Sequence, residues 1–252
     1  ESLDKTYLAK NLGNDTGYLY KYDYPPSNAP YYFEDRGADP AAYVPLPFKP
    51  ETNENDPRPE FIVRWVQAVN QSPAASFQSA VSEFVDIAQF IRHVATEVYL
   101  GDYDGFIGNW GINNFYMYRA EGQSRFVLLP WDKSESMRAP AESSIFHNLN
   151  DVPPEQRNRL MIGLLQFPKL YNLYLDTLLA VSTSANELVE GDGRGWLERE
   201  IQREYEQVRE AALTDPTKPY TNEGFEAQVQ ALLTFARTRG TQVAAQVAAA
   251  RR

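Results

Sequence analysis

The sequence of 252 residues contains no cysteine and only two histidines. Without cysteine the chain has no disulfide framework, no thiolate nucleophile and no thiolate metal ligand. Basic residues are also scarce, because 24 lysines and arginines stand against 34 aspartates and glutamates, for a net charge of −10. Binding to nucleic acid depends on Lys and Arg that neutralise phosphates. We therefore expect no nucleic acid among the partners.

Long apolar runs are missing as well. No stretch reaches the roughly 18 apolar residues of a membrane-spanning helix, so we expect no transmembrane segment. The start, Glu1 to Lys5, lacks the basic and then apolar layout of a signal peptide. It also lacks an initiator Met, which suggests a processed chain or a piece of a longer protein. A hydrophobic content of 43% with 13% aromatics predicts a compact globular protein with a substantial core.

The first 59 residues combine an aromatic segment with a proline-rich one. Residues 17–24 are rich in tyrosine, which favours strands, and predict a strand or hairpin arm that ends at Pro25-Pro26. Residues 27–59 contain many prolines and other turn formers, so we expect a long loop with little regular structure.

Apolar periodicity predicts helices over most of the remaining chain. The predicted helical ranges are 60–70, 74–84, 87–99, 153–166, 168–182, 195–213 and 222–250. In the third range, Ile87, Phe90, Ile91 and Val94 fall on one face, and Asp86 is placed to cap the first turn.

A glycine-rich loop and a hairpin interrupt the helices. The loop, residues 101–113, has four glycines and the acids Asp102 and Asp104. Residues 114–119 and 125–129 predict two strands joined by a turn, and the second strand ends in Pro130-Trp131-Asp132. A carboxylate should therefore lie at the end of one strand, beside the Asn113-Asn114 start of the other.

The strongest chemical constellation consists of Asp104, Asn113 or Asn114, and Asp132. Mg²⁺ prefers oxygen ligands from carboxylates and amides, completed by water and substrate phosphates. One Asp that orients an acceptor hydroxyl, with an Asn and a second Asp on the metal, would supply the parts that phosphoryl transfer needs. The same residue types also serve as ordinary turn and cap residues that satisfy backbone donors, and spacing alone does not separate the two.

This loop and hairpin resemble the CotH kinases, a family named for a bacterial spore coat protein. The similarity is carried by three segments: Leu100-Gly101-Asp102-Tyr103-Asp104-Gly105, Asn113-Asn114-Phe115-Tyr116-Met117-Tyr118 and Leu129-Pro130-Trp131-Asp132. Their order is similar to the family pattern of an Asp, then Asn-Tyr-hydrophobic-Leu-Tyr, then Pro-Trp-Asp. Weaker likeness at residues 4–8, 17–21 and 225–243 extends the resemblance over most of the chain.

The resemblance implies the C-terminal portion of an atypical protein-kinase-like domain, α+β and mostly α. Residues 1–59 would form a hinge-like start, the strand arm and the proline-rich loop. Residues 60–252 would form a helical lobe whose hairpin at 114–129 carries the metal site.

The implied activity is Mg²⁺-dependent transfer of phosphate from ATP to a protein substrate. Asp104 would match the catalytic-loop aspartate, as base or orienter, and Asn114 and Asp132 would bind the metal and the cofactor. Members of the family are commonly exported or lie at spore and cell surfaces, which implies an extracellular or surface location.

Three departures from the kinase pattern bear on this expectation. Ordinary kinases place the Asn five residues after the catalytic Asp, whereas Asn114 follows Asp104 by ten residues, so Asn109 competes for the role. Ser134 stands where many family members have a second Asp, which should weaken or reshape metal binding. The family's phosphate-gripping basic residues precede the segment that matches Glu1 to Lys5, so this portion alone should bind ATP poorly.

Two other functions stay open at this point. One is an inactive secreted or surface binding module that holds a partner through its acidic surface and the aromatic loop around Trp110. The other is a metal-dependent hydrolase that acts on phosphoesters without ATP. Neither His93 nor His147 has a Cys or a second His nearby in the sequence, so we expect them to be structural or solvated.

Overall fold

The computed structural model describes residues 3–24, 27 and 29–251. Within these residues it contains eight α-helices and one four-stranded antiparallel sheet of order β2-β1-β3-β4, so the fold is α+β and mostly helical, as predicted. The strands are β1 (Tyr18–Tyr22), β2 (Phe48–Pro50), β3 (Phe115–Arg119) and β4 (Val127–Pro130). The expected stop at Pro25-Pro26 lies outside the described residues.

The helices follow the predicted ranges closely, with one addition. They are α1 (Lys5–Leu12), α2 (Glu60–Gln71), α3 (Phe77–Ser82), α4 (Ile87–Tyr99), α5 (Arg159–Leu165), α6 (Pro168–Ala185), α7 (Trp196–Thr214) and α8 (Asn222–Ala250), with short 3-10 turns at Pro40–Ala42 and Pro154–Gln156. Sequence analysis missed α1, although Asp4 caps its first turn and Gly13, with φ of 69°, ends it.

One expectation about strands needs correction. The proline-rich segment contains β2, which pairs with β1 in antiparallel register, Tyr20 opposite Pro50. The predicted hairpin of β3 and β4 belongs to a larger sheet, because β1 pairs with the other edge of β3. All five residues of β3 are buried, and a buried strand needs partners for the backbone groups on both of its edges.

The sheet is buried on both faces, and successive side chains alternate between them. One face joins the main core through Tyr20, Tyr22, Phe115, Met117 and Leu128. The other face packs against α1 in a smaller cluster of Leu8, Leu19, Tyr116, Tyr118 and Leu129. The sheet is therefore held rigidly between α1 and the helical part of the chain.

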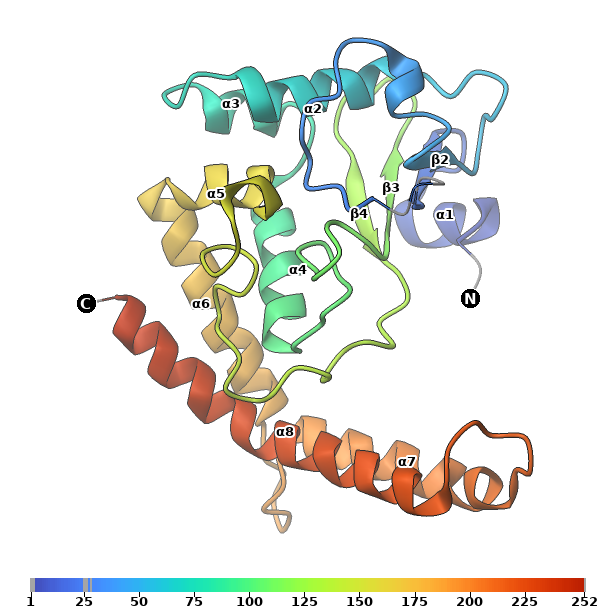
Figure 1. Cartoon of the computed structure of the whole chain (residues 1–252), viewed down its shortest axis with the longest axis vertical. Helices are drawn as coiled ribbons and strands as arrows, with labels where there is room; N and C mark the ends of the chain where they lie inside the picture. Colours follow the sequence, from blue (N-terminus) through green and yellow to red (C-terminus); the bar gives the residue numbers. More distant parts are fainter. Residues whose placement is uncertain (1–2, 25–26, 28, 252) are drawn as a thin grey trace.

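Figure 1 shows how the helices surround the sheet and extend beyond it. α4 runs through the centre, and its Asp86 cap accepts the Gln89 N–H at 3.0 Å, as predicted. α6 packs on α4, and α8 runs beside α7 over its first half before it crosses α6 toward the C-terminus. Among residues 3–24, 27 and 29–251, no helix combines the length and the apolar character needed to cross a membrane.

Candidate active site

Asp104 lies in the loop between α4 and β3, and two neighbouring amides hold its carboxylate. Nδ2 of Asn113 donates a hydrogen bond to Oδ1, and Nδ2 of Asn114 donates one to Oδ2, both at 2.8 Å. Both asparagines therefore contact Asp104 through their side chains. Because each amide donates through nitrogen, its Oδ1 oxygen is not used in this contact and is the atom suited to ligate a metal.

Asn109, the competing amide, faces a different part of the chain. Its Oδ1 accepts a hydrogen bond from Nδ2 of Asn148 at 2.9 Å and lies 2.8 Å from Nε2 of His147. Nδ1 of the same imidazole lies 3.0 Å from the Asp151 carboxylate. Asn109 therefore ties the glycine-rich loop to the segment at residues 147–148, whereas Asn113 and Asn114 are the two amides that contact Asp104.

Asp132 lies at the same end of the hairpin as Asn114. The backbone N–H of Trp131 donates to the carbonyl of Asn114 at 3.0 Å, so strand pairing continues up to the residue before Asp132. Asn114 and Asp132 both have left-handed backbone, with φ of 53° and 39°. Asn and Asp tolerate this conformation better than most residues, so the two polar side chains sit where the strands end and the backbone turns away.

The residues at this end of the hairpin supply hard oxygen ligands. Within the parts of residues 3–251 that the structure describes, no three His, Asp or Glu side chains form a metal-binding group. A divalent cation between Asp132 and Asn114 would therefore have one carboxylate and one amide from the protein. Such a donor set fits Mg²⁺, which commonly takes its remaining ligands from water and substrate phosphates.

Ser134 adds no acidic ligand to this set. Its backbone N–H points at Oδ1 of Asp132 over 3.4 Å, so it contacts the carboxylate through the main chain. The neighbouring Glu135 is directed to Arg138, 3.5 Å away.

A cavity of about 340 Å³ opens beside Asp104, and its wall is formed by Tyr24, Asp104, Trp110 and Asn113. The hydroxyl of Tyr24 donates to the carbonyl of Trp110 at 3.2 Å, while the Trp110 side chain is 53% exposed. Burial, assisted by the nearby charge of Asp104, raises the pKa of Tyr24 to about 12. The carboxylate therefore borders a space with neutral aromatic walls.

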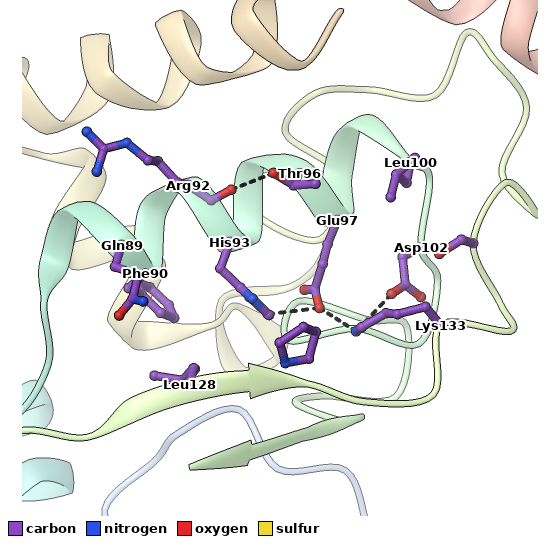
Figure 2. Close-up of a pocket in the computed structure, with 12 residues that line it drawn as sticks. Gln89, Phe90, Arg92, His93, Thr96, Glu97, Leu100, Asp102, Leu128 and Lys133 are labelled. Atoms are coloured by element: carbon purple, nitrogen blue, oxygen red, sulfur yellow. Dashed lines mark hydrogen bonds and ion pairs between the residues drawn. The ribbon is translucent and has the colours of Figure 1, made fainter. Parts of the chain in front are cut away.

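Sequence analysis missed a second polar cluster, which consists of Glu97, Asp102 and Lys133 (Figure 2). Nζ of Lys133 donates to Oε1 of Glu97 and, at 3.1 Å, to Oδ2 of Asp102. The Glu97 and Asp102 side chains are 6% and 0% exposed, and that of Lys133 is 28% exposed. A partly sheltered ammonium therefore joins two buried carboxylates.

The pKa values of these groups follow their surroundings. Burial would raise the pKa of Glu97, but the contacts and charges of His93 and Lys133 outweigh it and lower that pKa. Burial keeps the pKa of Asp102 above its usual value despite Lys133. The pKa of Lys133 is raised, because its two carboxylate partners outweigh the effect of its own burial.

This cluster forms part of the wall of a cavity of about 480 Å³ between α4 and β4. Its apolar wall comes mainly from Phe90, Leu100, Leu128 and Pro130. Nε2 of His93 lies 3.0 Å from Oε1 of Glu97 without hydrogen-bond geometry. The cavity therefore gives solvent access to the ammonium side of the cluster.

One signal in the sequence points to this cluster. Glu97 follows Phe90 and Val94 at seven and three residues, so it belongs to the apolar face of α4. A glutamate at such a position needs a buried partner. The partners, Asp102 and Lys133, lie in two separate loops, and nothing in their local pattern identifies them.

Comparison with known proteins identifies the family of this chain. A model of the CotH kinase protein family matches residues 1–243, and the chain therefore belongs to that family. The inner spore coat protein H of Bacillus subtilis (strain 168) is 24% identical over 247 residues, which cover 95% of this chain and 62% of the relative. The chain thus spans about three fifths of the length of that curated relative.

Proposed function

We propose that this member of the CotH kinase protein family transfers phosphate from ATP to a hydroxyl of a protein substrate. In this proposal Asp104 is the catalytic base that orients the acceptor hydroxyl, and Asp132 and Asn114 hold Mg²⁺ with the nucleotide phosphates. The observation that carries it is the direct bond from Asn114 to Asp104, together with the pairing of Asn114 with Trp131. These two contacts join Asn114 to Asp104 and pair Asn114 with Trp131, the residue before Asp132, at one end of the hairpin.

Asp104 would orient the acceptor hydroxyl and accept its proton. Each of its carboxylate oxygens already receives one amide N–H, which holds the group in one orientation, and a carboxylate oxygen has further lone pairs to offer. The cavity of about 340 Å³ beside it has room for the side chain that carries the hydroxyl. Positioning of this kind supplies much of the rate in phosphoryl transfer.

Asp132 and Asn114 would hold the metal at the end of the hairpin. When bound, Mg²⁺ would neutralise the charge of the transferring phosphate. Both residues have left-handed backbone, which Asn and Asp tolerate better than most residues. With one carboxylate and one amide from the protein, metal affinity should depend strongly on the presence of nucleotide.

The relative's printed name describes an inner spore coat protein, and we propose a spore coat or other surface location for this chain also. Its substrate would then be another protein of that layer. The departure at Ser134 supports a second candidate, an inactive module that keeps the fold and binds a partner, because Ser134 offers no second carboxylate near Asp132.

Calorimetry with ATP and Mg²⁺ tests the proposal, on this chain and on the longest natural form of the protein. Asp132→Asn should abolish the Mg²⁺-dependent part of ATP binding. Asp104→Asn should leave ATP binding intact and lower phosphate transfer about 10²- to 10⁴-fold. Asp215→Asn is the matched control, because Asp215 contacts only its neighbour Thr217 among the interactions described for its side chain.

The result that would overturn the kinase proposal is an absence of Mg²⁺-dependent nucleotide binding in the longest form. A folded protein with that property would be assigned to the binding module. Phosphoester turnover without ATP would instead indicate a hydrolase.

A further inference from the structure

Lys133 connects the two segments that carry the proposed acids. It follows Asp132 directly in the chain, and its ammonium contacts Asp102, which lies two residues before Asp104. Its other partner, Glu97, is in the last turns of α4. One side chain therefore joins the end of β4 to the start of the loop (Figure 2).

Both carboxylates of the cluster also hold the backbone of the loop. Oδ1 of Asp102 accepts the N–H of Asp104 at 3.0 Å, and Oε2 of Glu97 accepts the N–H of Phe106 at 2.8 Å. Each carboxylate thus uses one oxygen for Lys133 and the other for the loop. The loop is held on both sides of Gly105, immediately beside the proposed catalytic carboxylate.

These contacts form a closed ring. From Asp132 the path runs along the chain to Lys133, across to Asp102 and on to Asp104 through its N–H. From Asp104 it continues to Asn114, whose carbonyl accepts the N–H of Trp131, next to Asp132. A ring of short contacts restricts the relative movement of its members more than an open chain does, because each segment is fixed from two sides.

The charge balance makes Lys133 the critical member of the ring. Two buried carboxylates that face one ammonium repel each other once that ammonium is removed. They would then move apart or take up a proton, and either response weakens their hold on the N–H groups of Asp104 and Phe106. Loss of a partner from a buried ion cluster is far more disruptive than loss of an exposed one.

We propose that Lys133 is a positioning residue that fixes Asp104 relative to Asp132 by bridging Glu97 and Asp102. The role in phosphate transfer rests on the proposed function, but the hold on the loop does not. Lys133 touches neither substrate nor metal in this proposal, and it acts through the two carboxylates.

The adjoining cavity makes a selective test possible. Its volume of about 480 Å³ exceeds that of a small alkylammonium ion, and Lys133 is among the residues that line it. In Lys133→Ala, propylammonium can therefore enter and place a cation between Glu97 and Asp102. Tetramethylammonium at the same concentration carries the charge without N–H donors and controls for ionic strength.

The first readout is amide hydrogen exchange by mass spectrometry, without metal or nucleotide. In Lys133→Ala, exchange across residues 102–107 should be faster by about one order of magnitude or more, and propylammonium should slow it again. The second readout is the affinity for Mg²⁺ and ATP, which should fall about 10- to 100-fold, as for residues that orient metal ligands. Lys133→Arg should retain most of both properties.

Lys49→Ala is the matched control, since Lys49 forms an ion pair with Glu51 at 2.8 Å on the surface. It should change neither readout. If Lys133→Ala fails to fold, Lys133→Gln removes the charge at similar length and should show the same faster exchange.

Unchanged exchange at residues 102–107, or exchange that propylammonium does not slow, would overturn the proposal. Failure of the wild-type protein, in its longest natural form, to bind Mg²⁺ and ATP would instead overturn the proposed function. In that case the exchange result still decides whether Lys133 holds the loop.

Discussion

Two sheltered cations join the end of α4 to the segment that follows β4, and they do so by different chemistry. Lys133 contacts two carboxylates. Arg239, from α8, is fully buried and donates to the carbonyl oxygens of Val98, Tyr99, Ala141 and Ser143 at 2.7 to 2.9 Å. One cation is neutralised by anions, and the other is solvated by peptide groups.

The acceptors explain the difference in role. The last carbonyls of a helix have no partner within it and carry partial negative charge, so Arg239 satisfies groups that any fold with this helix end must satisfy. Burial lowers the pKa of Arg239, yet a guanidinium stays protonated near neutral pH. Lys133, by contrast, holds residues of the proposed site. We therefore assign Arg239 to global stability and Lys133 to local geometry.

The largest expected effect is that of Arg239→Met. Methionine fills similar volume but removes the guanidinium donors of four carbonyl oxygens, of which those of Val98 and Ser143 keep a second donor, so the free energy of unfolding should fall by about 3–5 kcal/mol. Urea denaturation followed by circular dichroism measures it. Arg203→Met, which removes a half-exposed partner of the surface residues Glu200 and Glu204, should change it by about 0–1 kcal/mol. A loss of similar size in both variants would contradict the assignment of Arg239.

Gly105→Ala tests the cluster around Lys133, and we expect an effect on stability smaller than that of Arg239→Met. A Cβ at this position would lie 2.6 Å from Oε2 of Glu97. That carboxylate cannot move aside without releasing Lys133 and the Phe106 N–H. We expect a loss of about 1–3 kcal/mol in stability together with faster exchange at residues 102–107.

Gly193→Ala is the control for this substitution, because a Cβ there meets nothing within 4 Å. It should leave both stability and exchange unchanged. Tolerance of Gly105→Ala without any change in exchange would mean that the Glu97 carboxylate is not held as firmly as its contacts indicate.

The smallest expected effect concerns Asp35, a carboxylate whose described partners are neutral. The N–H of Gly37 and the Gln71 amide, with a smaller contribution from the Tyr43 hydroxyl, lower its pKa. The folded state then binds fewer protons than the unfolded chain, so this contribution is present above about pH 4 and is lost as the pH falls through the folded-state pKa.

Asp35→Asn should therefore reduce stability at pH 7 by at most about 1 kcal/mol and should make little difference at pH 2. Thermal denaturation of the wild type and the variant at both pH values measures this. An equal difference at both pH values would show that the charge of Asp35 is not what its partners stabilise.

The helices were predictable because their signals are local. The predicted bounds of α4 and α8 agree with the structure, since caps and apolar spacing lie within the helices themselves. β2 escaped prediction because it has three residues and forms only by pairing with β1, which lies about 30 residues earlier.

In the proposed site, too, some features could be predicted from the sequence and others needed the structure. Asp104, Asn114 and Asp132 were identified from their sequence, and the contact between Asp104 and Asn114 formed as expected. The choice of Asn114 over Asn109 needed the structure, because the segment at 147–148 takes the Asn109 side chain.

The sequence by itself determined the helical character, the hairpin and the polar residues at its end, because each depends on neighbours within a few positions. Only the tertiary structure decided that Lys133 joins Glu97 and Asp102, and that Arg239 reaches the end of α4 from 140 residues away. The physical reason is that a buried charge can be satisfied by any suitable group that folding brings near. Its partner is therefore chosen by the packing of the whole chain.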